Sequence, residues 1–159
     1  MAEIVLAYDY EDEFLQLVKE YTDNIAQQGA EVVNCLATQN LSSELAHVED
    51  KYGLPDGRMY IARVDGIAAG CVALTKNDDV FCEIKRLYVK PVFRGQGISK
   101  LLLETVVTEA RKIGYKHMRL DTFPFMASAI KLYEKHGFYN IERYNDNFAP
   151  SAIFMQVDL

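Results

Sequence analysis

Cysteine, long apolar runs and an excess of positive charge are all scarce or missing in this sequence of 159 residues. The three cysteines, Cys35, Cys71 and Cys82, are odd in number and widely spaced, which favours reduced thiols of a cytosolic protein over a disulfide framework. No apolar run approaches the roughly 18 residues of a membrane-spanning helix, and residues 1–4 lack the basic region of a signal peptide. The sequence therefore predicts a cytoplasmic protein with no membrane partner.

The charge balance and the histidines restrict the ligands that we expect. The chain has 17 Lys and Arg residues against 23 Asp and Glu residues, which gives a net charge of −6 at pH 7. A nucleic-acid-binding face needs a basic surplus, so no nucleic-acid partner is expected, whereas a cationic amine is compatible with this charge. His47, His117 and His136 share no metal-ligand spacing, and we therefore expect no metal.

The length and the hydrophobic patterns predict one domain over residues 1–159. Half of the residues (50%) are hydrophobic and one quarter (25%) are charged. This composition is ordinary for a globular protein. Period-2 alternation predicts strands and period-3.6 spacing predicts helices. Together they give an α/β chain in the order β-αα-βββ-α-β-α-ββ. The expected strands are 3–8, 59–64, 67–75, 80–89, 115–122, 138–143 and 152–157, and the expected helices are 11–28, 42–52, 98–113 and 126–136.

The segment 91–100 joins a predicted strand to a predicted helix and carries two glycines. Gly95 and Gly97 let the backbone approach a ligand closely. The first amides of a helix have no partner inside it and lie at the positive end of its dipole, and Arg94 and Lys100 add positive charge. These features predict a phosphate or pyrophosphate site. The segment has neither the Gly-Lys pair of a P-loop nor the third glycine of the dinucleotide pattern.

The same segment resembles the acetyl-CoA loop of the GNAT superfamily of N-acetyltransferases, written [RQ]-x-x-G-x-[GA]. Arg94, Gly97 and Ser99 occupy its three key positions, with a serine in place of glycine or alanine. Downstream, residues 129–138 resemble the family's A-x-x-L-Y-x-x-x-G-F segment. Two motifs in the right order, separated by room for one helix and one strand, are more specific than either alone. The resemblance covers about residues 60–138.

The resemblance implies a mixed twisted sheet with helices on both sides and acetyl-CoA as the cosubstrate. In such proteins the pantetheine arm pairs with the strand before the loop, and the loop holds the pyrophosphate. The family often has an asparagine three residues before the position of Ala129, where this chain has Met126. The residues that the resemblance assigns to acetyl-CoA are Leu87, Val89, Arg94, Gly95, Gln96, Gly97, Ser99, Lys100 and Ala129.

Two side chains are candidates for catalysis through the same resemblance. Glu83, counted back from Val89, matches the glutamate that acts as base in histone-acetylating members. Tyr133 matches the tyrosine that donates a proton to the leaving thiolate. The alternative for Glu83 is a solvent-facing side chain opposite a basic neighbour on the next strand, and the alternative for Tyr133 is a core ring beside Leu132.

The identity of the acceptor stays open in the sequence. The first hypothesis is acetylation of a primary amine on a small or amino acid-like molecule. The second is a protein or peptide N-acetyltransferase, and the third is a non-catalytic acyl-CoA-binding module, which the presence of both Glu83 and Tyr133 disfavours. Segments 121–126 and 144–149 are expected near the acceptor. Arg86 or Arg119 could hold a carboxylate, although both are expected to be ordinary surface residues. A homodimer is compatible with the sequence.

Overall fold

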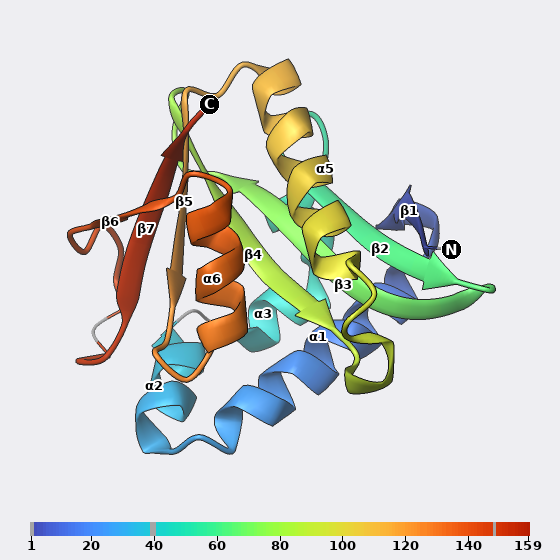
Figure 1. Cartoon of the computed structure of the whole chain (residues 1–159), viewed down its shortest axis with the longest axis horizontal. Helices are drawn as coiled ribbons and strands as arrows, with labels where there is room; N and C mark the ends of the chain where they lie inside the picture. Colours follow the sequence, from blue (N-terminus) through green and yellow to red (C-terminus); the bar gives the residue numbers. More distant parts are fainter. Residues whose placement is uncertain (1, 39–40, 148) are drawn as a thin grey trace.

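A seven-stranded mixed sheet crosses the molecule, with helices on both of its faces (Figure 1). The computed structural model describes residues 2–38, 41–147 and 149–159. Within these ranges the strand order is β1-β2-β3-β4-β5-β7-β6, and neighbours are antiparallel except for the parallel pair β4–β5. The strands are β1 (Ala2–Leu6), β2 (Arg58–Val64), β3 (Ile67–Lys76), β4 (Phe81–Val89), β5 (His117–Thr122), β6 (Tyr139–Ile141) and β7 (Ile153–Asp158). The predicted mixed α/β class is confirmed.

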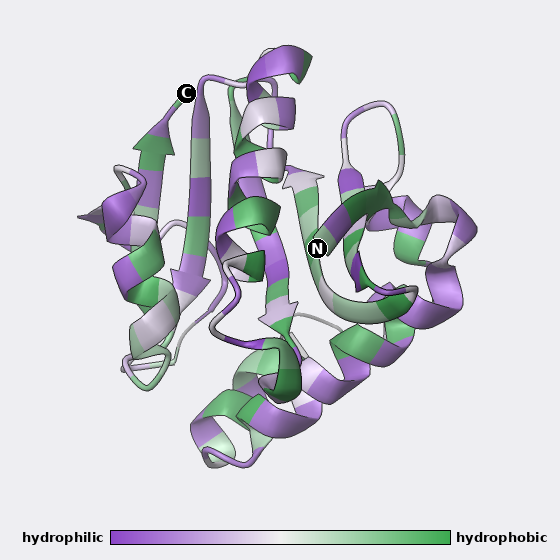
Figure 2. Cartoon of the chain, turned by 45° about the vertical axis from the view of Figure 1, so that its right-hand side comes forward, coloured by the Kyte–Doolittle hydropathy of each residue, from purple (hydrophilic) through white to green (hydrophobic). Residues whose placement is uncertain are grey.

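Six α-helices cover the sheet in the part of the chain that the structure describes. They are α1 (Glu11–Ala26), α2 (Ala30–Thr38), α3 (Leu41–Ala46), α4 (Val48–Tyr52), α5 (Ile98–Ile113) and α6 (Ala127–Lys135). None of these helices combines the length and the hydrophobicity needed to cross a membrane. Hydrophobic and hydrophilic residues alternate along the helices (Figure 2), as expected for elements with one buried side.

Strand β3 shows how the two faces are built, because successive side chains point to opposite faces of a sheet. Val72 and Leu74 belong to the core cluster that contains Leu102 of α5. Cys71 and Ala73 belong to the cluster that contains Phe14 of α1. The predicted inward face of α1 and the predicted helix 98–113 therefore pack on opposite sides of the same strand. Cys35, Cys71 and Cys82 are all buried.

The region between β1 and β2 differs from its prediction. The sequence predicts helices over 11–28 and 42–52, whereas the structure has α1, α2, α3 and α4 there. Helix α2 was missed because a helix of nine residues is marginal alone and depends on tertiary contacts. Its side chains Val32 and Leu36 belong to a buried cluster with Ile25 of α1 and with Phe123. The predicted start of the second helix at residue 42 lies inside α3, which begins at Leu41.

Strand β4 separates from β5 halfway along its length. The register between them runs only from Phe81 opposite His117 to Glu83 opposite Arg119. On the other side of β4 the register with β3 shifts between Cys71 and Ala73, and Arg86 has a φ of 59°. A positive φ is unusual for a residue other than glycine, and such a bulge bends a strand. The two strands diverge beyond this point (Figure 1).

A buried ion pair ties the helical cover to the bulge. Arg86 donates from Nε and Nη2 to the two carboxylate oxygens of Glu44 in α3, at 2.9 Å each. Lys51 of α4 donates to the same carboxylate at 2.9 Å. Burial alone would raise the pKa of Glu44, but the hydrogen bonds and charges of Arg86 and Lys51 lower it to about 2. The expectation that Arg86 is a surface residue is wrong, because its side chain is 4% exposed.

Candidate active site

A groove of about 630 Å³ lies along the diverging end of β4, between the loop before α5 and the start of α6. It brings together residues that are far apart in the sequence. The predicted cosubstrate-binding residues that line it are Leu87, Val89, Arg94, Gly95, Gly97, Ser99, Lys100 and Ala129. Gln96, the ninth, is exposed and is not among the described residues that line the groove.

The loop has the backbone shape that its glycines predict. Gly95 and Gly97 have φ values of 80° and 78°, in the left-handed region that glycine adopts without steric cost. A Cβ atom at either position would meet no atom within 4 Å, so the backbone conformation, not crowding, requires glycine here. Gly97 is also the N-cap of α5, so the unpartnered amides of the first helical turn border the groove. The site therefore fits a phosphate group.

Arg94 is turned back onto the strand that precedes the loop. Its Nε donates to the carbonyl oxygen of Val89 at 3.0 Å, and its guanidinium lies 6.0 Å from the centre of the Tyr88 ring. The side chain lines the groove and adds positive charge to the same wall.

A second, narrower pocket of about 40 Å³ adjoins the groove where β4 leaves β5. Lys85, Arg86 and Leu87 form the β4 wall, and Asp121 lies on the β5 wall. Leu87 and Met126, the residue at the family's asparagine position, line both spaces. Tyr21 and Ile25 of α1 also line both spaces, so a long ligand in the groove and a small ligand in the pocket would meet beside Leu87, between α1 and Met126. The remaining described lining residues are Cys35, Leu36, Ile84, Leu120, Thr122, Phe123 and Tyr133.

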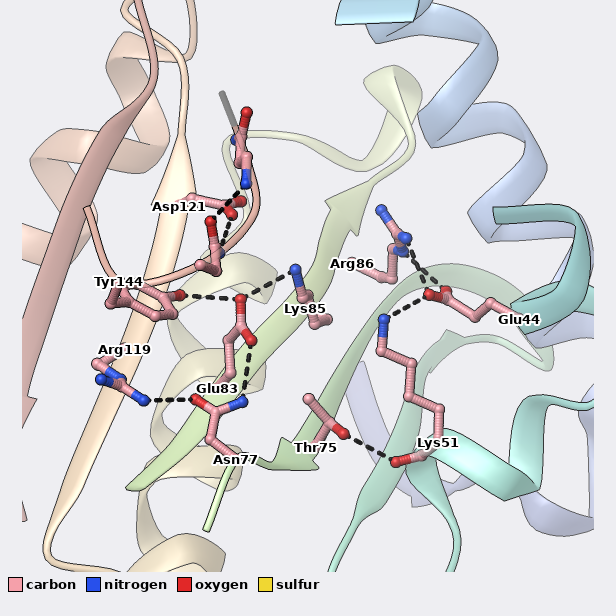
Figure 3. Close-up of polar contacts among 12 residues, drawn as sticks. Glu44, Lys51, Thr75, Asn77, Glu83, Lys85, Arg86, Arg119, Asp121 and Tyr144 are labelled. Carbon is pink, nitrogen blue, oxygen red and sulfur yellow. Dashed lines mark hydrogen bonds and ion pairs between the residues drawn. The ribbon is translucent and has the colours of Figure 1, made fainter. Parts of the chain in front are cut away.

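Glu83 lies in a buried polar network behind this pocket (Figure 3). Its Oε2 is 2.9 Å from Nζ of Lys85 and accepts a hydrogen bond from the Tyr144 hydroxyl at 2.8 Å. Its Oε1 accepts from the amide of Asn77 at 3.2 Å. Burial would raise the pKa of Glu83, but the charge of Lys85 and the three hydrogen bonds lower it. Glu83 is therefore ionised at neutral pH.

The alternative interpretation of Glu83 as a solvent-facing residue is wrong, because Glu83 is 5% exposed. Its charge partner is Lys85 on the same strand, although Arg119 does stand opposite it on β5. Arg119 instead donates to Asn77 at 3.1 Å and stacks on the rings of Phe81 and Tyr144. Among the described residues, Lys85 borders the narrow pocket whereas Glu83 and Arg119 do not.

Tyr133 belongs both to the core and to the narrow pocket. Its ring packs against Phe138 with centroids 5.5 Å apart, as the core interpretation expects, and the residue also lines the pocket. Burial raises the pKa of its hydroxyl, so the hydroxyl keeps its proton at neutral pH. No protein group in the described ranges forms a hydrogen bond with it. Tyr133 is thus a neutral donor at the pocket.

Sequence reasoning did not single out three charged or polar residues of the pocket: Tyr21, Lys85 and Asp121. Asp121 entered only as the end of a segment, and its Oδ2 accepts from the amide of Asn145 at 2.7 Å. The one available signal was the adjacent pair Lys85-Arg86, which interrupts the apolar alternation of β4. Tyr144 and Asn145 bring part of the predicted loop to the site, while Phe148 lies outside the described residues. No group of three potential metal ligands occurs among the residues described.

Comparison with known proteins gives a family for this architecture. The model of the Acetyltransferase (GNAT) family matches residues 16–138. An uncharacterized N-acetyltransferase of Schizosaccharomyces pombe is 37% identical over 150 residues, which cover 93% of this chain and 88% of that protein. N-acetylaspartate synthetase of Danio rerio is 33% identical over 112 residues, which cover 69% of this chain and 40% of that protein.

Solved structures share the fold. A GNAT-family acetyltransferase of Staphylococcus aureus has a TM-score of 0.78 at 18% identity, with 99% of both chains covered. The PaiA N-acetyltransferase of Thermoplasma acidophilum, solved in complex with coenzyme A, has a TM-score of 0.73 at 20% identity, with 100% of this chain and 99% of that chain covered. The family model, the relatives and the splayed sheet agree: this chain belongs to the GNAT family of acetyltransferases and is an acyltransferase that uses acetyl-CoA.

Proposed function

We propose that this enzyme transfers an acetyl group from acetyl-CoA to the primary amine of a small, amino acid-like acceptor. The observation that carries the proposal is the junction of two unequal spaces at Leu87, a groove of about 630 Å³ and a pocket of about 40 Å³. The groove suits the long cosubstrate, and the pocket admits only a narrow acceptor group. The name of the relative N-acetylaspartate synthetase also supports an acceptor of the amino acid type.

In this proposal the loop and the free edge of β4 hold the cosubstrate. Gly95, Gly97, Ser99 and Lys100 contact the pyrophosphate through backbone amides and the lysine charge. Leu87 and Val89 offer backbone groups to the pantetheine arm, because β5 does not pair with β4 beyond Glu83. Ala129 bounds the opposite wall, Arg94 adds positive charge, and Gln96 stays at the exposed rim.

Glu83 serves as the base through Lys85. An alkyl amine with a pKa of about 10.4 is almost fully protonated at pH 7. Forming the neutral, reactive amine at that pH costs about 4.6 kcal/mol. Glu83 does not border the pocket, whereas Lys85 borders it and touches Glu83. Lys85 passes its proton to Oε2 of Glu83 and takes one from the acceptor ammonium. The acceptor is then neutral, and the displaced proton resides on Glu83.

Tyr133 completes the reaction as the acid. Acetyl-CoA supplies the thioester carbonyl that the amine attacks and the thiolate that leaves. The neutral hydroxyl of Tyr133 lines the pocket beside Leu87 and gives its proton to the departing sulfur. The nitrogen loses its second proton as the amide forms, and water carries that proton to the Tyr133 phenolate. Bulk water takes up the proton held on Glu83 after the products leave. The environments set the starting protonation states that these opposite tasks require, because the lowered pKa of Glu83 leaves it ionised and the raised pKa of Tyr133 leaves it protonated.

The first test is a thiol assay of CoA release from acetyl-CoA by the pure protein with a panel of amines and peptides. We expect turnover with small amines or amino acids and little turnover with peptides that carry a free N-terminus or lysine. Turnover with peptides alone would replace the proposed acceptor class by the protein-acetylating one. No release with any amine would contradict the proposed reaction.

Substitution Gly97→Val should abolish acetyl-CoA binding while the domain stays folded. Valine at a φ of 78° is strained by about 1–2 kcal/mol, and it would occupy the space proposed for the pyrophosphate. Arg94→Ala should weaken binding by about 1.5–3 kcal/mol, the range for a charged hydrogen bond. Calorimetry measures both affinities.

The matched control is Gly66→Val in the β2–β3 turn, where φ is 79° and the surroundings are equally open. This variant should lose similar stability in a thermal melt but bind acetyl-CoA normally. Equal losses of affinity in the two valine variants would show that backbone strain alone explains the effect.

Substitution Glu83→Gln should lower kcat more at pH 7 than at pH 9.5, because more of the acceptor is already neutral at high pH and a base matters less. The pH profile of kcat measures this. Tyr144→Phe is the control, because it removes one hydrogen bond to Glu83 but keeps the carboxylate. A loss of the same size at every pH in Glu83→Gln would assign Glu83 a structural role.

Substitution Tyr133→Phe should lower kcat by roughly 10²–10³, at or below the usual contribution of a positioned acid. KM for acetyl-CoA should change little, since the hydroxyl acts only as the C–S bond breaks. Tyr115→Phe is the control, because its hydroxyl donates to Asp56 at 2.7 Å outside the pocket. Steady-state kinetics measures the effect, and thermal melts check that the variants are folded. An unchanged kcat would remove Tyr133 from the mechanism.

A further inference from the structure

Arg86 brings an unused cationic donor to the narrow pocket. Its Nε and Nη2 are both bound to Glu44, whereas Nη1 has no hydrogen-bond partner among the described residues. Figure 3 shows that end of the guanidinium pointing away from Glu44. The side chain is 4% exposed and Arg86 lines the pocket. The pocket is therefore the space that Nη1 can reach.

The geometry of Arg86 is fixed before any acceptor arrives. The bidentate contact with Glu44 holds the guanidinium plane, and the bulge at φ 59° holds the backbone. A guanidinium held in this way suits a carboxylate, which it binds with matched geometry and charge. Nη1 of Arg86 is not one of the fully enclosed unpaired polar atoms among the described residues, so it stays accessible to a small anion.

The charges around the pocket are unequally distributed between its two walls. Glu44 is shared by two cations, Arg86 and Lys51, which leaves one positive charge in excess on that side. Lys85 is already matched by Glu83. On the β5 wall, the carboxylate of Asp121 accepts a hydrogen bond from the neutral amide of Asn145. No cation lies within 4.0 Å of Asp121 in the described part of the chain.

From this arrangement we infer that the acceptor is a free amino acid whose carboxylate binds Nη1 of Arg86 and whose ammonium faces Asp121. The inference rests on the proposed function and names its substrate class. A pocket of about 40 Å³ has room for only a few water-sized groups, so the two charged groups of the acceptor must lie on the same or adjacent carbons. Asp121 would hold the ammonium on the wall that faces Lys85.

The decisive experiment compares amino acids with their own carboxamides in the wild-type protein, by CoA release. Glycine with glycinamide and leucine with leucinamide are suitable pairs. The amide has the less basic amine, so intrinsic reactivity at pH 7 favours the amide, and a preference for the acid must come from the protein. We expect kcat/KM to be about 10–150-fold higher for the acid, the factor for one charged hydrogen bond.

The outcomes separate this inference from the proposed function. Equal or faster turnover of the carboxamides would overturn the carboxylate site and leave the acetyl transfer standing. Peptides with free N-termini that react as well as amino acids would overturn it too, since they carry no carboxylate beside the amine. No CoA release with any amine would mean that the proposed function itself is wrong.

Substitution Arg86→Lys tests the residue itself. Lysine keeps a positive charge for Glu44 but has no second arm that reaches the pocket, so the acid-to-amide ratio of kcat/KM should fall by most of the wild-type preference. Arg58→Lys is the matched control, since Arg58 pairs with Glu109 and borders neither the groove nor the pocket. An unchanged ratio in Arg86→Lys would overturn the assignment. The wild-type comparison needs no variant, so it decides the question even if Arg86→Lys fails to fold.

Discussion

The ion pair between Arg86 and Glu44 is the contact on which the site depends. It joins α3 to the bulge of β4 through two hydrogen bonds of 2.9 Å between side chains that are 4% and 3% exposed. Removing one partner of such a buried pair typically costs about 3–5 kcal/mol, because the other charge is left uncompensated. The pair does more than add stability, because it holds the bent strand and the helical cover in one arrangement.

The bend of β4 gives the sheet a free edge in its interior. Backbone groups that would pair with a neighbouring strand are instead open to a ligand along Leu87 to Val89. A buried backbone group needs a partner, and in the proposed function the cosubstrate provides it. The narrow pocket lies at the same divergence of β4 and β5, so the proposal places both reactants at one distortion.

The surroundings of each polar group near this opening determine its protonation state or how far its charge is neutralised. Glu83 is buried, yet Lys85, Asn77 and Tyr144 keep it ionised. Tyr133 is buried without such partners and stays protonated. Arg86 is only partly neutralised, because Glu44 also serves Lys51. The charged side chains Lys85, Arg86 and Asp121 border the narrow pocket, and the proposed choice of acceptor depends on them.

Local patterns in the sequence were sufficient for much of the fold. The Asp65-Gly66 turn, the loop glycines and the helix that ends at Gly114 are each encoded by neighbouring residues. The same holds for the groove, since eight of the nine residues assigned to acetyl-CoA line it. These features were predictable because turn geometry and helical periodicity depend on contacts within a few residues.

Tertiary structure alone decided the rest. The apolar side of helix α2 is buried in a cluster that contains Ile25 of α1 and Phe123, which is distant in sequence. Arg86 was expected at the surface, and a solvent-facing side chain was the alternative for Glu83, because charged side chains are almost never fully buried unless they are paired. The partner of Arg86 stands 42 residues earlier in the chain, and nothing local distinguishes Glu44 from the other carboxylates of an acidic protein. The sequence by itself determined the glycine loop before α5, and only the packing of α3 against β4 decided which charged side chains border the narrow pocket.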